Sequence, residues 1–115
     1  MSYLLVDDSE EFLASAARLL ESQGLEVVAC ATSSGAALEL AARLRPEVAL
    51  VDIELGDEDG IELARKLTAG PSSIRVVLIS SYARDDLGDL VANTAAVGFL
   101  PKSDLGAAAI ERLLR

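Results

Sequence analysis

Tyr3-Leu4-Leu5-Val6-Asp7-Asp8 and Val48-Ala49-Leu50-Val51-Asp52 are the two stretches that decide the fold. Each is an apolar run of strand length that ends in an acid. Open parallel sheets bind ligands beyond the carboxyl ends of their strands, at the point where the strand order reverses. If the two runs are neighbouring parallel strands, Asp7, Asp8 and Asp52 meet at that edge. Three like charges there repel one another unless a cation holds them together, so the sequence predicts a site for a hard metal such as Mg²⁺.

The composition bounds the class of protein. The chain has 115 residues and a formal net charge of −9, and we expect residues 1–115 to form one domain, with any output domain absent from this chain. No stretch reaches the roughly 20 apolar residues that cross a bilayer, and the N-terminus lacks the basic and apolar regions of a secretion signal. We therefore expect a cytoplasmic protein without membrane contact. The negative charge argues against direct binding of nucleic acid, whose phosphates require several Lys or Arg side chains.

Two residue types narrow the chemistry further. Histidine is absent, which excludes His-based acid–base catalysis and His metal ligands, and any phosphohistidine must come from another protein. The single cysteine, Cys30, lies in an apolar run and cannot form an internal disulfide. We interpret it as a buried core residue.

Apolar runs of strand length alternate five times with amphipathic segments of helix length, which is typical of a parallel sheet covered by helices on both faces. The predicted strands are residues 3–6, 25–30, 47–51, 74–79 and 96–100. The predicted helices are 10–23, 34–44, a third from the end of the acidic loop 54–60 to Gly70, a fourth at 84–92, and a fifth that begins at the N-cap Ser103. Right-handed crossovers place the first and third strands side by side in the order 2-1-3-4-5. The predicted fold class is α/β, a flavodoxin-like doubly wound five-stranded parallel sheet with five helices.

Local signals support the first helix. Ser9 is its predicted N-cap and Gly24 its predicted stop. The residues that recur at helical spacing on its inner face are Phe12, Ala16, Leu19 and Leu20.

Two more polar residues fall on the same edge of the predicted sheet. The fourth apolar run closes with Ser80, and the fifth leads through Pro101 to Lys102. Four of the five strands thus deliver three acids, a hydroxyl and an ammonium group to one rim. Mg²⁺ binds few carboxylates and shares its ligands with water or phosphate oxygens, so this set suggests a metal that works together with a phosphoryl group.

The whole chain resembles the receiver domain of two-component response regulators. The residues that carry the resemblance are the acid pair Asp7-Asp8, Asp52 behind its apolar run, Ser80 after a strand, and Gly98-Phe99-Leu100-Pro101-Lys102. The chain departs from the usual pattern of that family at two positions. Gly56 stands where the family often has proline, and Glu54 places an acid two residues after Asp52.

The resemblance implies roles for these residues. Asp52 would accept a phosphoryl group from the phosphohistidine of a sensor histidine kinase or phosphotransfer protein. Mg²⁺ would be held by Asp7, by Asp8 more directly, by one oxygen of Asp52 and by the backbone carbonyl of Glu54. The phosphoryl-binding and switch residues would be Ser80, Lys102 and Phe99. Such a domain modifies only itself rather than acting as an enzyme on a separate substrate, and it would signal to an output domain or a homodimer partner.

Plainer interpretations exist for each residue taken alone. Asp7 and Asp8 suit a helix start, Ser80 suits a strand terminus, Lys102 suits a solvated surface position, and Phe99 suits the core. Asp52 at the end of a buried run would be costly without a partner. The combination favours a shared site over these separate explanations.

Three other functions remain open at this point. A Mg²⁺-dependent phosphohydrolase with an aspartyl-phosphate intermediate has similar chemistry, but typically carries an aspartate where this chain has Glu54. A receiver that signals by protein contact without phosphorylation would not need all five site residues. A flavodoxin-like cofactor module would need a phosphate cradle and ring-stacking aromatics, whereas this chain has an acidic loop after the first strand and no tryptophan.

Overall fold

The structure, a computed structural model, describes residues 1–70, 74–81, 89, 92 and 94–115. The strands are β1 (Ser2–Val6), β2 (Glu26–Ala31), β3 (Val48–Asp52), β4 (Glu54–Leu55), β5 (Glu58–Asp59), β6 (Arg75–Ser80) and β7 (Gly98–Pro101). The helices are α1 (Glu10–Ser22), α2 (Ser34–Leu44), α3 (Gly60–Ala69) and α5 (Ala107–Leu114), with a 3-10 turn, η1, at Lys102–Asp104. The helix predicted at 84–92 lies largely outside the described residues. None of the helices in the described ranges is long and apolar enough to span a bilayer.

The central sheet has the strand order β2-β1-β3-β6-β7, with every neighbouring pair parallel. The predicted order 2-1-3-4-5 is confirmed, because β6 and β7 are the fourth and fifth predicted strands. Val6 of β1 pairs with Val51 of β3. The residues that follow, Asp7 and Asp52, therefore leave the sheet side by side at the point where the strand order reverses.

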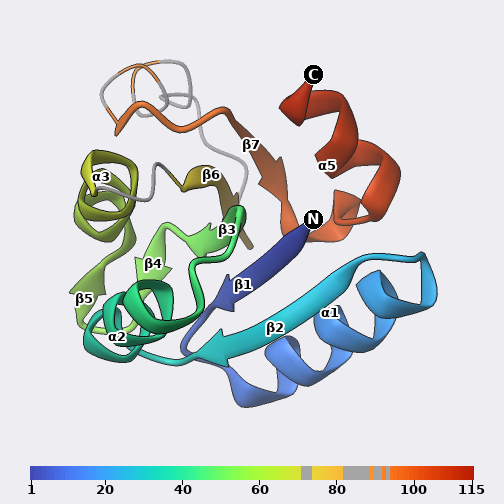
Figure 1. Ribbon diagram of the computed structural model, residues 1–115, viewed down its shortest axis with the longest axis horizontal. Helices are drawn as coiled ribbons and strands as arrows, with labels where there is room; N and C mark the ends of the chain where they lie inside the picture. The colour runs from blue at the N-terminus through green and yellow to red at the C-terminus, as the bar shows by residue number, and fades with distance from the viewer. Residues whose placement is uncertain (71–73, 82–88, 90–91, 93) are drawn as a thin grey trace.

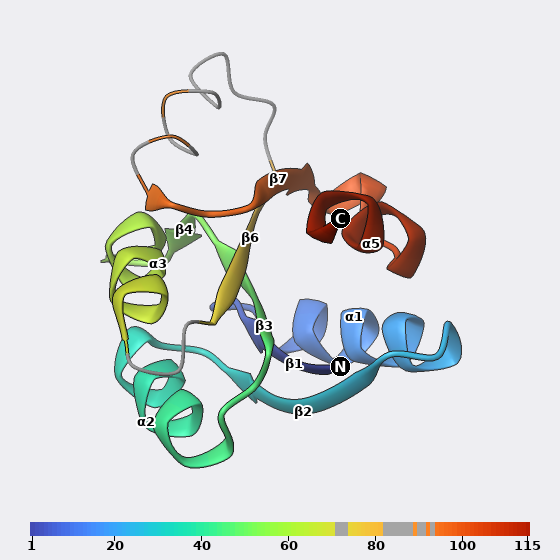
Figure 2. The ribbon, with the colours of Figure 1, turned by 45° about the horizontal axis from the view of Figure 1, so that its top comes forward.

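Helices cover both faces of this sheet. Figures 1 and 2 show α2 and α3 on one face, and α1 and α5 on the other. Alternate residues of β1 serve the two faces, as a pleated strand requires. Leu4 and Val6 pack in the cluster under α2 and α3, and Tyr3 and Leu5 pack in the cluster under α1 and α5. Both faces of the strand are apolar because both are buried.

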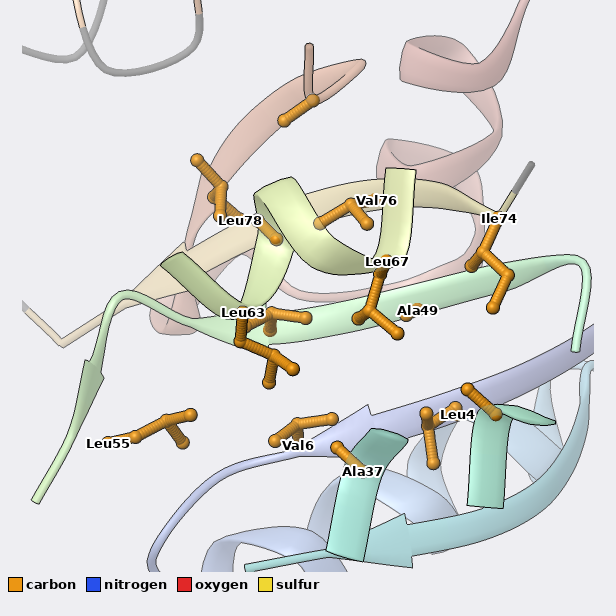
Figure 3. Close-up of a cluster of buried hydrophobic side chains, with 14 of the residues drawn as sticks. Leu4, Val6, Ala37, Ala49, Leu55, Leu63, Leu67, Ile74, Val76 and Leu78 are labelled. Atoms are coloured by element: carbon orange, nitrogen blue, oxygen red, sulfur yellow. The ribbon is translucent and has the colours of Figure 1, made fainter. Parts of the chain in front are cut away.

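The cluster under α2 and α3 joins these two helices to the strands that carry the acids. Figure 3 shows Leu63 and Leu67 of α3 directed towards the strands, with Ala37 of α2 close to Val6. The inner face of α3 is buried as its spacing requires, from Ile61 to Leu67. Burying one such leucine contributes about 1.5–3 kcal/mol. The ends of β1 and β3 are thus held by packing before any polar contact is considered.

The predicted signals at α1 are confirmed in part. Ser9 caps the helix, since its hydroxyl oxygen accepts a hydrogen bond from the Phe12 N–H at 3.2 Å. Gly24 follows the helix in a left-handed conformation with φ of 95°. The inner face is turned slightly from the prediction: Leu13 is buried, and Leu19 is 40% exposed.

The predicted start of the last helix at Ser103 is wrong. Lys102–Asp104 form η1, closed by a hydrogen bond from the Leu105 N–H to the Lys102 carbonyl, and α5 begins at Ala107. The side-chain oxygen of Gln23, at the end of α1, accepts a hydrogen bond from the Ala107 N–H at 2.7 Å. This partner lies 84 positions away in the sequence, so no local pattern could reveal it.

The interpretation of Cys30 as a core residue is also wrong, because its side chain is exposed. Cys30 pairs with Leu5 in the sheet, but β2 is an edge strand. Side chains at the edge of a sheet are covered less completely than those on central strands. Apolar sequence around a residue therefore does not ensure its burial.

Tyr3 yields a first prediction. Its side chain is fully buried, and its hydroxyl has no hydrogen-bond partner among the described residues. Burial, with the nearby Glu111 carboxylate, raises its pKa. The Tyr3→Phe variant should be as stable as the parent at neutral pH, or more stable by up to about 2 kcal/mol, because an unsatisfied polar group is removed. Urea unfolding measures this, and a loss above about 1 kcal/mol would show that the hydroxyl has a partner.

The same residue predicts a pH dependence. A raised pKa means that the folded protein keeps the phenol proton where the unfolded chain loses it. The contribution to stability is complete below the ordinary tyrosine pKa of about 10 and is lost as the pH rises through the raised value. The parent should lose more unfolding free energy above pH ~10 than the Tyr3→Phe variant.

Gly60 provides a third prediction. A Cβ atom on Gly60 would lie 1.9 Å from the Asp52 carbonyl oxygen and 2.8 Å from the Ile53 carbonyl oxygen, both on the backbone. Gly60→Ala should therefore push α3 away from the end of β3 and cost about 3 kcal/mol or more in urea unfolding. Gly35→Ala is the matched control, since a Cβ on Gly35 of α2 meets nothing within 4 Å. It should be neutral or stabilising by up to about 1 kcal/mol.

Candidate functional site

The carboxyl ends of the strands bring the predicted polar residues to one rim. Asp7 and Asp8 follow β1 directly, Asp52 is the last residue of β3, and Ser80 is the last residue of β6. Lys102 follows β7 as the first residue of η1. These positions follow from the parallel pairing, because parallel strands end at the same edge.

Ion pairs tie the rim together. The Lys102 Nζ lies 2.6 Å from Asp7 Oδ2 and 3.1 Å from Asp52 Oδ2. Asp7, Asp8 and Asp52 each offer a carboxylate oxygen within 4.8 Å of the others. One ammonium group thus offsets part of the repulsion in a cluster of three acids.

The three acids differ in burial and in partners. Asp7 is fully buried, and its Oδ1 accepts a hydrogen bond from the Ser9 N–H at 2.9 Å while its Oδ2 faces Lys102. Asp8 is exposed and makes no hydrogen bond or ion pair to the described part of the chain. Asp7 is therefore held in place by its partners, whereas the Asp8 carboxylate has no hydrogen bond or ion pair to the described residues and is available to a ligand.

Asp52 is buried, with 4% of its surface exposed. Burial raises the pKa of Asp52, against the opposing effects of the Glu54 N–H and of Lys102. Its Oδ1 accepts the hydrogen bond from the Glu54 N–H at 3.0 Å, and Oδ2 pairs with Lys102. The carboxylate is thus oriented at both oxygens while its charge is poorly solvated, which suits a group that gains from a cation or from covalent modification.

Lys102 is held from two sides. Burial lowers the pKa of Lys102, but the contacts with Asp7 and Asp52 outweigh burial, so that its pKa is raised overall. The ammonium group also lies over the ring of Phe12, 4.3 Å from the ring centre. Lys102 therefore stays charged in the site.

The acidic loop after Asp52 forms a small hairpin. β4 and β5 pair antiparallel around a two-residue turn in which Gly56 has a φ of 60°. Proline cannot adopt this angle, so the departure at Gly56 belongs to a defined turn. Glu58 of β5 accepts a hydrogen bond from the Ser34 N–H of α2 at 2.9 Å, and Asp59 accepts one from the Ile61 N–H of α3 at 2.9 Å. The hairpin is thereby anchored to the starts of two helices.

An open cavity of about 370 Å³ lies above the acids. Its lining residues are Asp7, Asp8, Ser9, Asp52, Glu54, Gly56, Ser81 and Lys102. The cavity therefore brings together all three predicted acids and the predicted lysine, and it has room for a small ion with its ligands.

Two predicted residues, Ser80 and Phe99, are not part of the cavity lining. Ser80 is fully buried at the end of β6, and its neighbour Ser81 lines the cavity instead. Phe99 is half-buried on β7 and packs against the cluster under α2 and α3. Their switch roles stay predictions.

Phe12 is the site residue that the sequence pattern did not reveal. Its helical spacing indicated only a core position, and it does pack against the cluster under α1 and α5. The contact with Lys102 links residues 12 and 102 through the tertiary fold alone. An aromatic residue in the first turn after an acid pair is the only local signal.

The donor set fits a hard divalent cation. Mg²⁺ and Ca²⁺ prefer carboxylate and carbonyl oxygens, and the rim offers three carboxylates within 4.8 Å of one another. The exposed, uncommitted carboxylate of Asp8 is the most accessible donor. Mg²⁺ typically keeps several waters, and the open cavity leaves space for them.

Comparison with known families gives a match over nearly the whole chain. The family described as Response regulator receiver domain matches residues 3–113. The protein-glutamate methylesterase/protein-glutamine glutaminase 1 of Vibrio cholerae is 34% identical over 102 residues, which cover 86% of this chain and 27% of that protein. Response regulator GacA of Pseudomonas aeruginosa is 31% identical over 100 residues, which cover 86% of this chain and 47% of that protein. The chain spans less than half the length of these two relatives.

A solved structure agrees with these matches. The crystal structure of a response regulator protein from Burkholderia pseudomallei, with a phosphorylated aspartic acid, calcium ion and citrate, superposes with a TM-score of 0.85 at 28% identity. The match covers 99% of this chain and 66% of that chain.

The ion pairs of Lys102 predict how the protein responds to losing its ammonium group. Lys102→Gln leaves Asp7 and Asp52 buried without a cation, which should cost about 2–4 kcal/mol of unfolding free energy in the presence of a chelator. The loss should be smaller in excess Mg²⁺ if a cation binds at the acids, because it would replace part of the missing charge.

The only other lysine supplies the control. Lys66 is exposed on α3 and has no ion pair within the described ranges, so Lys66→Gln should change stability by less than about 0.5 kcal/mol. Equal effects of the two substitutions, measured by urea unfolding, would contradict the importance of the ion pairs.

Proposed function

Because the chain belongs to the response regulator receiver family, we propose that Asp52 is the residue that accepts the phosphoryl group. The observation that carries this proposal is the convergence of Asp7, Asp8 and Lys102 on the Asp52 carboxylate. This carboxylate lies at the cavity and is oriented at both oxygens. Its neighbours are the groups that phosphoryl transfer requires, namely hard-metal donors and a cation.

The proposed reaction joins an Asp52 oxygen to phosphorus. The bond from phosphorus to the donor breaks at the same time, and the electron pair leaves with the histidine nitrogen of a kinase or with the acetate of acetyl phosphate. Positioning and electrostatic stabilisation provide most of the catalysis in such transfers. The Glu54 N–H orients one oxygen of Asp52, and Lys102 supplies a compact positive charge for the incoming phosphoryl oxygens.

We propose that Mg²⁺ is held by Asp8, Asp7, Asp52 and the backbone carbonyl of Glu54. The carboxylate cluster supports this assignment. When bound, the metal would keep Asp52 ionised and neutralise charge on the phosphoryl oxygens. The chain's own contribution is to keep the donors together, through the Ser9 N–H on Asp7 and through the hairpin that carries Glu54.

The switch residues are Ser80, which would bind the attached phosphoryl group, and Phe99, which would respond by changing its burial. Phosphorylation adds nearly two negative charges and three strong acceptors. The placement of Ser80 at the end of β6, with Phe99 on the neighbouring β7, is compatible with this response. A change at the rim would thereby alter the surface around β7.

The proposal extends to the cellular role of the chain as a receiver domain with a separate phosphoryl donor. Residues 1–115 would act as one receiver domain in the cytoplasm, with a sensor histidine kinase or phosphotransfer protein as donor. The chain would modify only itself, and enzymatic activity in relatives such as the Vibrio methylesterase would belong to parts that this chain does not cover. Output would pass to another domain or to a second copy of the chain.

The test is incubation of the protein with acetyl phosphate and Mg²⁺, followed by intact-mass spectrometry. A single phosphoryl adduct is expected, which Asp52→Asn should abolish and a chelator should suppress. Asp57→Asn is the matched control. Asp57 is an exposed acid in the turn between β4 and β5, so its substitution should leave the adduct unchanged. An equal adduct in Asp52→Asn would overturn the proposal.

The same samples distinguish the phosphohydrolase alternative. Repeated turnover of a small phosphate ester, lost in Asp52→Asn, would indicate an enzyme with an aspartyl-phosphate intermediate. A receiver should show one adduct that decays slowly, without turnover of such esters.

A further inference from the structure

We propose that the ring of Phe12 is a positioning residue that holds the Lys102 ammonium group at the acid cluster through a cation–π contact. The consequence for phosphoryl transfer rests on the proposed function, whereas the contact itself does not. The Lys102 Nζ lies 4.3 Å from the centre of the ring. This distance is well within the roughly 6 Å over which an aromatic face attracts a cation.

The ring is fixed to the same turn that carries the acids. The Ser9 N–H donates to Asp7 Oδ1 at 2.9 Å, and the Phe12 N–H donates to the Ser9 side-chain oxygen at 3.2 Å. Two consecutive hydrogen bonds therefore set the start of α1 relative to Asp7. The Phe12 side chain is half-buried against the cluster under α1 and α5, which restricts its movement further.

The ring differs in kind from the other two partners of Lys102. Asp7 and Asp52 belong to the carboxylate set that a metal would use. Their negative charge would therefore interact with both the metal and Lys102. The face of an aromatic ring attracts an ammonium group but is no ligand for a hard cation. Phe12 therefore gives Lys102 a partner that does not compete for the metal's donors.

An aromatic side chain at position 12 suits the site better than an acidic one would. The first turn of α1 already contains Glu10 and Glu11, and the chain has a net charge of −9. A further carboxylate beside Lys102 would add to the repulsion within the cluster. The ring attracts the ammonium group without adding charge. The attraction corresponds to about a 2-fold to 30-fold effect on an equilibrium or a rate.

The decisive experiment keeps the shape of the ring and changes its electrostatics. Phe12 is replaced by its mono-, di- and trifluorinated analogues, which weaken the attractive face stepwise with little change in size. Each protein is unfolded in urea with a chelator present, with Lys102 intact and in the Lys102→Gln background. We expect the folding equilibrium to weaken stepwise along the series, about 2-fold to 30-fold in total, only when Lys102 is present. A series that is flat in both backgrounds, or equally steep in both, would overturn the proposal.

A second measurement connects the contact to the reaction. The rate of adduct formation from acetyl phosphate should fall along the fluorinated series and in Phe12→Leu, and should be retained in Phe12→Tyr. If the parent protein forms no adduct, the proposed function fails while the unfolding cycle still decides whether Phe12 holds Lys102. If the parent forms the adduct and the rate is constant along the series and in Phe12→Leu, the positioning role is overturned.

Discussion

Repulsion among the carboxylates of Asp7, Asp8 and Asp52 is the constraint on which the site depends. Parallel strands that end at one edge bring these groups within 4.8 Å of one another, and burial of Asp7 and Asp52 removes the water that would screen them. The ammonium group of Lys102 offsets part of this repulsion, because its Nζ lies 2.6 Å from Asp7 Oδ2 and 3.1 Å from Asp52 Oδ2. The same unfavourable crowding makes the rim receptive to a divalent cation, so one electrostatic problem accounts for both the lysine and the predicted metal.

Packing of the apolar core brings the three carboxylates together and keeps them from moving apart. Leucine and valine side chains on both faces of β1 and β3 lock the strand ends in register, so the acids cannot move apart without loosening the sheet. Gly60 lets α3 begin directly against the Asp52 carbonyl. The hairpin formed by β4 and β5 is anchored to α2 and α3 through Glu58 and Asp59. Site geometry and fold stability are therefore parts of the same packing arrangement.

Membership of the receiver family fits this physical picture but does not specify an output. The Vibrio and Pseudomonas relatives extend well beyond the matched region, to more than twice its length. One is named as a methylesterase and the other as a response regulator. A common receiver fold thus serves proteins of different overall function. What this chain contributes is the rim itself, with the buried Asp52 that we propose as the phosphoryl acceptor and the strands that connect it to the rest of the surface.

The strand order and the meeting of Asp7, Asp8, Asp52 and Lys102 could be predicted from the sequence. Apolar runs and the polar residues at their ends are local patterns, and a parallel sheet with right-handed crossovers brings those ends to one edge. The tertiary structure alone decided the exposure of Cys30 and the start of α5 on the Gln23 side chain. It likewise decided the contact between Phe12 and Lys102. Each of these depends on which distant element lies alongside, either a sheet edge left uncovered or a helix 84 positions away. Periodicity reports which face of an element is apolar, but only packing determines what that face meets.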